Sequence, residues 1–252
     1  MKALFSLLLL LSGFQLYAQK GRGKVSLYVF DENWKGCRPE EVRYLLHLEE
    51  FSDTAYQFRY YNYEGPMITQ ETYKDKNRKI PHGEFNYYND RGQMDSTGYW
   101  VNGKKHDWWY HYTDSFTMWK KEKYHMGTLV LQMDRAAIEA EREEKKDTEQ
   151  HFDESEAVFK GGDNEWMRYI QKNIQYPNRA SKLEKSGRLV IQFVVNTNGT
   201  TGEFKILRSI EYSLDEEAIR IIRNSPKWRP AHQDGKLVKA YRIQPLVFQV
   251  PR

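Results

Sequence analysis

Four histidines in the middle of the chain are the first residues whose chemistry needs an explanation. Asp107 and Asp114 lie close to them, so imidazole and carboxylate groups that could bind a metal ion are near one another in the sequence. Their spacing follows a repeat in the surrounding sequence and does not match a metal-ligand pattern such as H-E-x-x-H. Alternation along β-strands explains them better, and no metal or cofactor is expected. The four histidines are His82, His106, His111 and His125.

Aromatic and sulfur chemistry is also suggested by single features of the sequence. The cluster Trp108-Trp109-Tyr110 could stack on a sugar ring, although filling a core between hairpins is the more common use of such residues. Cys37 is the one cysteine of the chain. It has no partner for a disulfide bond and no nearby histidine to activate it, so a partly buried thiol is the simpler interpretation.

Two acidic groups resemble general acid–base pairs. One is Asp163 with Glu165, and the other is the run Asp215-Glu216-Glu217. Both groups fall in the first turn of a predicted helix, where the helix dipole stabilises negative charge. With no nucleophile, base and orienting group in a recognisable arrangement, the sequence indicates a protein that is not an enzyme.

The elements that carry the histidines and aromatics repeat along the N-terminal half. The segment 82–88 returns as 106–112, and 98–103 returns more loosely as 123–127, a spacing of roughly two dozen residues. Each unit alternates aromatic and polar residues and ends in a turn such as Asn-Asp-Arg-Gly or Val-Asn-Gly-Lys. One hairpin cannot bury its own face, so we expect an antiparallel β-meander of repeated hairpins.

The rhythm of glycine, aromatic and paired tyrosines resembles the MORN-like repeats of bacterial YwqK-type and toxin–antitoxin-type proteins. The resemblance extends roughly over residues 24–133, with Asp107 in place of the usual second glycine. It implies a β-scaffold or interaction surface and brings no enzymatic activity with it.

The two ends of this scaffold have different characters. At the N-terminus, Lys2 precedes the apolar run 3–11, and Ala18 is a small residue at a suitable cleavage site, so residues 1–18 are predicted to be a secretory signal peptide. An uncleaved signal that anchors the chain in the inner membrane is the alternative. At the other end, residues 134–156 are strongly acidic and rich in helix formers, and beyond Ile138 they lack an apolar stripe. We expect a solvated, charged helical linker.

The domain organisation follows from these boundaries. We predict a signal peptide over residues 1–18, a MORN-like domain over 19–133, the linker over 134–156 and a C-terminal domain over 157–252. From residue 157 onward the chain has 17 lysines and arginines against 9 aspartates and glutamates. This basic module is predicted to attract acidic protein surfaces. Nucleic acid is not an expected partner, because an exported protein does not meet it.

The C-terminal module is predicted to be α+β, with two helices on a three-stranded antiparallel sheet. Asp163 can cap a first helix whose apolar stripe is Trp166, Tyr169, Ile170 and Ile174. Strands follow at 189–195 and 204–208, and Ser213-Leu214-Asp215-Glu216 reads as the capping box of a second helix that Pro226 ends. A third strand is expected over 238–248, with Val238, Tyr241, Ile243 and Phe248 inward and Lys239, Arg242 and Gln244 mainly toward water.

An ordered set of motifs in this module resembles the TonB C-terminal domain, over residues 157–250. The motifs are Phe159-x-Gly-Gly, Tyr176-Pro177, Gly187, Phe193-Val194-Val195-x-x-x-Gly199, Leu214-Asp215-x-x-Ala218, Pro226-x-Trp228-x-Pro230, Gly235-Lys236 and Pro245-x-x-Phe248. Domains of this family bind the extended TonB box of outer-membrane transporters by adding a strand to a sheet edge.

The resemblance implies which residues meet such a peptide. Exposed edge strands offer unpaired N–H and C=O groups to an extended segment. The expected peptide-binding residues are Tyr176, Pro177, Lys239, Tyr241, Arg242 and Ile243. The expected partner is an outer-membrane TonB-dependent transporter or another envelope protein, and the same edge could pair two copies of the chain.

The chain also departs from a TonB energy transducer. Such a transducer has a retained membrane anchor and a long proline-rich span, whereas here the signal looks cleavable and the linker is short and charged. We therefore expect a periplasmic adaptor, linked to TonB-dependent transport, that binds envelope partners. The alternative is a structural envelope protein whose MORN-like repeats bind protein, lipid or glycan.

Overall fold

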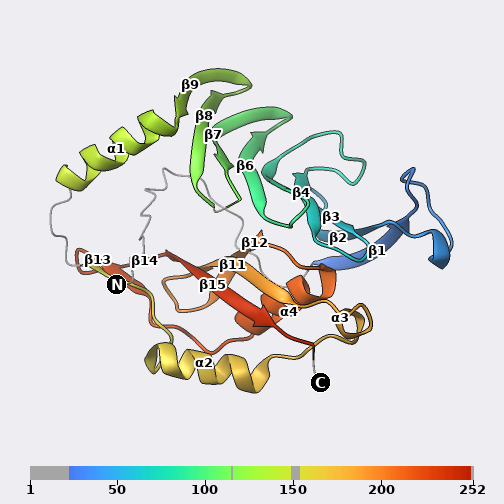
Figure 1. The fold of residues 1–252 in the computed structure, drawn as a ribbon. Helices are drawn as coiled ribbons and strands as arrows, with labels where there is room; N and C mark the ends of the chain where they lie inside the picture. Colours follow the sequence, from blue (N-terminus) through green and yellow to red (C-terminus); the bar gives the residue numbers. More distant parts are fainter. Residues whose placement is uncertain (1–22, 115, 149–153, 251–252) are drawn as a thin grey trace.

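The structure is a computed structural model that describes residues 23–114, 116–148 and 154–250. It is a mixed α/β protein with many antiparallel strands and few helices. A nine-stranded sheet built by the N-terminal half stands over a three-stranded sheet near the C-terminus, and helices cover the far side of the smaller sheet (Figure 1). The predicted signal peptide, residues 1–18, lies outside the described residues.

The large sheet is a continuous meander in which each strand pairs antiparallel with the next in sequence. Most connections are short hairpin turns, as the alternating pattern predicts, whereas residues 31–43 and 74–82 form longer loops. A short 3₁₀ helix, Pro39–Glu41, interrupts the first connection. The strands are β1 (Lys24–Phe30), β2 (Tyr44–Ser52), β3 (Ala55–Asn62), β4 (Met67–Tyr73), β5 (Gly83–Tyr88), β6 (Met94–Val101), β7 (Lys104–Tyr112), β8 (Met118–His125) and β9 (Thr128–Asp134).

Two glycine positions, one in a turn and one within a strand, show why the repeats need a residue without a side chain. The β6–β7 turn places Asn102 and Gly103 in the left-handed region, with φ angles of 49° and 79°. Asparagine and glycine tolerate this region, which matches the strand twist in a tight hairpin. Gly98, within β6, lies under Trp109, and a Cβ there would come within 2.1 Å of the indole.

The charged segment after β9 forms helix α1 (Arg135–Thr148). It is less solvated than its composition suggests, because Ile138 is buried and Lys121 of β8 forms an ion pair with Glu141. The other described side chains of α1 are mostly exposed, as expected for a solvated helix. One apolar residue and one ion pair hold it against β8 and β9.

The C-terminal region contains the expected two helices and three strands, together with smaller elements that the sequence pattern did not show. The central sheet has the order β12-β11-β15, and a second small sheet has the order β10-β13-β14. The elements are β10 (Glu154–Ser155), α2 (Gly162–Asn173), α3 (Asn178–Lys182), β11 (Gly187–Val195), β12 (Thr201–Arg208), α4 (Tyr212–Arg223), β13 (Ala231–Gln233), β14 (Lys236–Val238) and β15 (Ala240–Phe248).

Both helix starts differ from the predicted caps. Helix α2 begins at Gly162, with Gly161 as its N-cap and not Asp163. In α4 the cap is Glu211, whose carboxylate accepts hydrogen bonds from the backbone N–H groups of Ser213 and Leu214 at 2.9 and 3.1 Å. The predicted capping box at Ser213 is wrong because the glutamate two residues earlier reaches these donors first.

A single apolar core joins the two halves of the described chain. Leu45, Tyr61 and Met67 of the large sheet belong to the same buried cluster as Leu214 and Ile222 of α4. Tyr61 packs edge-on against Tyr212, with ring centroids 5.5 Å apart. The large sheet therefore packs directly against the C-terminal module and is not joined to it by the linker alone.

No helix in the described ranges is long and apolar enough to cross a membrane.

Candidate functional site

Strand β15 forms one edge of the three-stranded sheet and is the first candidate site. It pairs antiparallel with β11 in unbroken register, from Gly187 opposite Phe248 to Val195 opposite Ala240. Along its other side, no strand within the described ranges pairs with it. Pro245 lies within β15 and removes one N–H donor, which is typical of edge strands. The strand can therefore offer main-chain groups to an extended segment chiefly over Ala240–Gln244.

Two side chains of β15, those of Tyr241 and Ile243, point in the opposite sense to the prediction. Tyr241 and Ile243 are exposed, at 40% and 58%. Arg242 and Gln244 lie on the partly buried side, where Gln244 accepts a 2.6 Å hydrogen bond from Trp166 Nε1 of α2. The predicted inward position is therefore wrong for Tyr241 and Ile243, whereas Phe248 is buried as expected. Val238 belongs to β14 and not to this strand.

The exposed face of β15 looks toward the large sheet. Burial, together with the nearby carboxylates of Glu203 and then Glu84 of β5, raises the pKa of Tyr241. Its hydroxyl therefore stays protonated at neutral pH and can donate a hydrogen bond. An added strand would meet apolar side chains and a hydroxyl donor on this face.

The positive residues at β15 are partly engaged. Lys239, just before the strand, forms a 3.0 Å ion pair with Glu203. Arg242 forms a 2.7 Å ion pair with Glu156. All four side chains are at least partly exposed, so both pairs are weak and open to exchange with an acidic ligand.

Tyr176 and Pro177 lie at the far end of β15 from Lys239. The Tyr176 ring packs edge-on against Phe248, the last residue of the strand, at a centroid distance of 6.3 Å. Its hydroxyl donates to the backbone carbonyl of Lys185, and Pro177 is the N-cap of α3. The structure thus brings the six predicted residues to one strand and its two ends, with Tyr176 partly in a structural role.

The opposite edge of the same sheet, β12, is covered by the large sheet at its C-terminal end. Arg208 forms a β-bridge with Gln93, and the N–H of Ser209 donates to Gly92 O at 2.8 Å. Tyr88 OH donates to Ile206 O at 2.7 Å. These main-chain contacts occupy part of the groups that an added strand would need.

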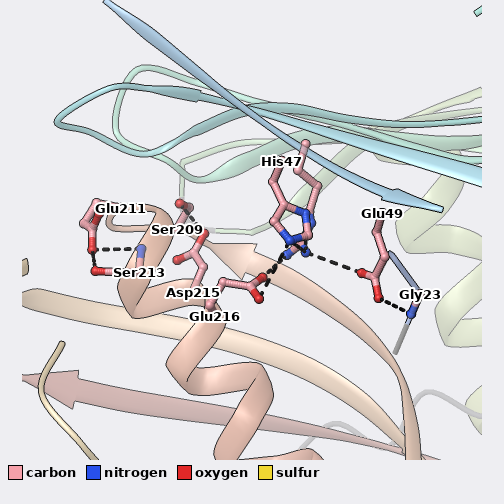
Figure 2. A network of polar contacts seen from close by, with 9 residues as sticks. Gly23, His47, Glu49, Ser209, Glu211, Ser213, Asp215 and Glu216 are labelled. Atoms are coloured by element: carbon pink, nitrogen blue, oxygen red, sulfur yellow. Dashed lines mark hydrogen bonds and ion pairs between the residues drawn. The ribbon is translucent and has the colours of Figure 1, made fainter. Parts of the chain in front are cut away.

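A buried polar network closes this contact between the halves (Figure 2). Arg59 of β3 is 3% exposed and forms a 2.7 Å ion pair with Glu216 of α4. It also donates to His47 Nδ1 at 2.9 Å and lies 3.7 Å from Glu49. Burial lowers the pKa of Arg59, but the nearby Glu216, Tyr61 and Glu49 raise it by more, so the guanidinium stays charged.

Asp215 is the most strongly perturbed acid beside this network. It is fully buried, and its carboxylate accepts hydrogen bonds from Ser209 Oγ at 2.6 Å and from the N–H of Ile210 at 3.3 Å. Ser209 Oγ in turn accepts from Met67 N at 2.8 Å. Burial raises the pKa of Asp215 to about 8, against the opposing effect of the Ser209 hydrogen bond. The group joins the two halves structurally, because Ser209 Oγ contacts both Asp215 and Met67 N.

The sequence interpretation of the acids at 215–217 as dipole-stabilising groups accounts for only part of this arrangement. Of the three, only Asp215 lies in the first turn of α4. Asp215 and Glu217 are buried, and Glu216 forms an ion pair with Arg59. Sequence reasoning missed Arg59, His47 and Glu49 entirely. The one available signal was the alternation of His47 and Glu49 with leucines along one segment, which resembles ordinary solvent-facing alternation.

The four histidines of the repeats lie on the strands and connecting loops of the large sheet. Within the described ranges, no three histidine, cysteine, aspartate or glutamate side chains are grouped to hold a metal ion. His82 and His106 instead accept hydrogen bonds from the N–H groups of Asn102 and Met126 at the following hairpin turns, both at 3.3 Å.

Comparison with known proteins agrees with the geometry of the C-terminal sheet. Residues 172–250 match the family described as the Gram-negative bacterial TonB protein C-terminal. This region is therefore similar to the TonB C-terminal domain. The match covers about a third of the chain, and the nine-stranded sheet lies outside it.

A solved structure is also similar to part of the chain. The NMR solution structure of Helicobacter pylori TonB-CTD (residues 179-285) has 19% sequence identity, covers 36% of this chain and 87% of its own, and has a TM-score of 0.27. No curated protein sequence matches the chain.

Proposed function

We propose that the chain is an exported protein of the Gram-negative cell envelope whose TonB-like domain binds an extended peptide along β15. The single observation that carries this is the free edge of β15, with Tyr241 and Ile243 exposed beside it. Main-chain pairing would supply affinity, and side chains at alternate positions would supply selectivity. The partner would be an outer-membrane transporter or another envelope protein, and the chain would serve as an adaptor without catalytic activity.

The charge around the edge favours an acidic peptide. Lys239 and Arg242 already form ion pairs with partly exposed acids near the strand, and the whole domain carries excess positive charge. Binding that depends on such rim charges weakens as the salt concentration rises.

The test is an amide NMR titration of the full chain with an acidic heptapeptide copied from the N-terminal segment of an outer-membrane transporter. We expect shifts concentrated on Ala240–Gln244. Ile243→Lys should weaken binding by about tenfold, because it replaces an apolar contact. Leu129→Lys is the matched control, since Leu129 is an exposed apolar strand residue of the other sheet, at 45%. Shifts confined to the large sheet would contradict the proposal.

A second candidate function belongs to the large sheet. Its last strand, β9, exposes Leu129, Val130 and Leu131 by 45%, 55% and 46%. An apolar edge of this kind marks a surface for another molecule. We infer as the alternative that the repeats, interpreted as MORN-like, scaffold envelope components by binding protein, lipid or glycan.

The two candidates should be separated in the full chain. The halves share one core, so isolated halves would expose Leu45, Tyr61 and Met67. Capture of envelope partners by the full chain should be lost with Ile243→Lys if β15 is the binding edge, and with Val130→Lys if the scaffold function holds. Pairing of two copies through β15 would show as Ile243→Lys converting a dimer into a monomer.

A further inference from the structure

A hollow of about 400 Å³ lies on the large sheet, away from β15. Most of the residues that line it are apolar, and four of these residues are aromatic. Trp34 stands at its rim, 45% exposed, with its ring stacked on Tyr44 at a centroid distance of 4.0 Å. The lining residues are Phe30, Trp34, Leu46, Phe58, Tyr60, Ile68, Thr69, Glu71 and Arg78.

Trp34 and Arg78, which lie at the rim of this hollow, occupy two turns of the same kind. Trp34 lies in the sequence Asp-Glu-Asn-Trp-Lys and Arg78 in Asp-Lys-Asn-Arg-Lys. In both, the aspartate carboxylate accepts hydrogen bonds from the N–H groups two and four residues later. Both rim residues have left-handed backbones, with φ angles of 60° and 59°. Bulky side chains seldom adopt this region, so two separate turns hold Trp34 and Arg78 in unusual conformations at one hollow.

The polar groups of the hollow have hydrogen-bonding capacity left over. Arg78 Nη1 donates to Tyr60 OH at 2.5 Å, and its guanidinium lies 5.9 Å from the ring of Phe58. Glu71 Oε2 accepts from Tyr73 OH at 2.9 Å. Among the residues that the structure describes, no donor reaches the second oxygen of Glu71 and no acceptor reaches the remaining N–H groups of Arg78. A guanidinium and a carboxylate thus both line an aromatic hollow with unused capacity.

This combination limits the class of ligand. An anion would meet Glu71 and a cation would meet Arg78, whereas a purely apolar ligand would take water from both without replacing its hydrogen bonds. A neutral ring with hydroxyl groups at its edge and C–H groups on its face can bind all three kinds of group. Its hydroxyls pair with Glu71 and Arg78, and its C–H groups pack against the aromatic rings. We propose that this hollow binds one pyranose ring of a neutral glycan, with the ring face against Trp34 and its hydroxyls shared by Glu71 and Arg78.

The angles between the aromatic rings favour a puckered ring over a flat one. Trp34 meets Tyr60 at 77° and Phe30 at 45°. A flat heterocycle is best held between parallel faces, which these steep angles do not provide. The site does not depend on strand addition at β15, so its test can fail while the proposed peptide binding stands, and the reverse also holds.

The test is saturation-transfer NMR on the full chain with chitotriose and maltotriose as probes and adenosine as the flat-ring comparison. We expect saturable binding of at least one trisaccharide. Trp34→Ala should weaken it by about tenfold or more, through loss of the stacking face. Glu71→Gln keeps the shape of the hollow and should weaken binding by several-fold, because a charge-assisted acceptor is lost.

Trp119→Ala is the matched control, since Trp119 is a comparably exposed indole on β8, at 44%. It should leave binding unchanged. Failure of both trisaccharides to bind would overturn the proposal, as would saturable binding of adenosine alone. Equal trisaccharide affinity in wild type, Trp34→Ala and Glu71→Gln, with all three proteins folded by amide NMR, would also overturn it.

Discussion

The two edges of the three-stranded sheet carry the same main-chain chemistry but face different surroundings. The β12 edge ends in contacts with the large sheet, where Arg208 bridges to Gln93 and Ser209 donates to Gly92. The β15 edge has no strand beside it in the described part of the chain. An unpaired strand edge invites any extended segment, so covering one edge restricts strand addition to the other.

The comparison teaches that the large sheet does more than add a second surface. It fixes α4 and β12 through buried ionic and apolar contacts while it leaves β15 free (Figure 1). The selectivity of the C-terminal domain for one edge therefore depends on its N-terminal neighbour. Mutations at the contact should therefore destabilise the covered β12 edge. The following predictions are ordered by the size of the expected effect on stability.

The largest effect is expected from Arg59→Met. It removes the one guanidinium from a buried cluster that includes Glu216 and Glu49, and uncompensated buried charge costs about 3–5 kcal/mol of unfolding free energy. Urea unfolding measures this loss. Arg91→Met is the control, because Arg91 and its partner Asp114 are 74% and 62% exposed and their pair contributes at most about 1 kcal/mol. Equal losses in both variants would mean that the buried network does not hold the edge closed.

An intermediate effect is expected from Gly92→Ala. Gly92 has a φ of 70°, and a Cβ there would lie 2.4 Å from Ser209 O, in the contact that covers β12. Overpacking against backbone costs about 1–3 kcal/mol, in addition to the strain of the left-handed residue.

Gly103→Ala is the matched comparison, since Gly103 has a φ of 79° but no atom within 4 Å of the added Cβ. It should lose only the strain, about 1 kcal/mol. Hydrogen exchange should show faster opening of β12 amides in Gly92→Ala alone. Similar exchange rates in the two variants would mean that the contact between Gly92 and Ser209 does not protect the amides of β12.

The last prediction is a pH dependence at Asp215, which is the smallest effect when it is counted per pH unit. Its folded pKa of about 8 lies above the ordinary value of 3.8, so the folded state keeps a proton that the unfolded chain has lost. The stabilising contribution is complete below pH 3.8 and is lost as the pH rises toward 8. Between about pH 5 and 7, stability should fall by about 1.4 kcal/mol per pH unit from this group alone.

Asp215→Asn isolates this contribution. The substitution keeps an acceptor for the N–H of Ile210 and removes the titration. Urea unfolding of wild type and variant across pH 5–9 should give a steeper decline in the wild type. Parallel profiles would show that Asp215 is not protonated in the folded protein.

Much of the fold could be predicted because its signals are local. Each hairpin has its own turn, such as Asn102-Gly103, and α4 has an apolar stripe through Leu214 and Ile222. The cap at Glu211 was missed because Ser213 offers an equally good pattern two residues later. Short α3 was missed because five residues carry too little periodicity to detect.

The candidate sites were only partly predictable because they depend on long-range contacts. Tyr241 and Ile243 alternate with polar residues as a buried face would. The side that is buried is the other one, where Gln244 binds Trp166 and where Leu246 and Phe248 lie. Arg59 resembles a solvent-facing strand residue until α4 brings Glu216 against it. Trp34 and Arg78 share a turn pattern in the sequence, but nothing local shows that the two turns meet at one hollow.

The shared core also determines when a growing chain can become stable. Leu45 and Tyr61 are synthesised early, but the residues they pack against on α4 come more than 150 positions later. Hairpins of the meander can close locally and fast, whereas these distant contacts wait for the end of synthesis. Until then the inner face of the first strands stays uncovered, and a nascent chain with such a face requires protection from aggregation. The residues that close one edge of the mature domain thus also delay its completion.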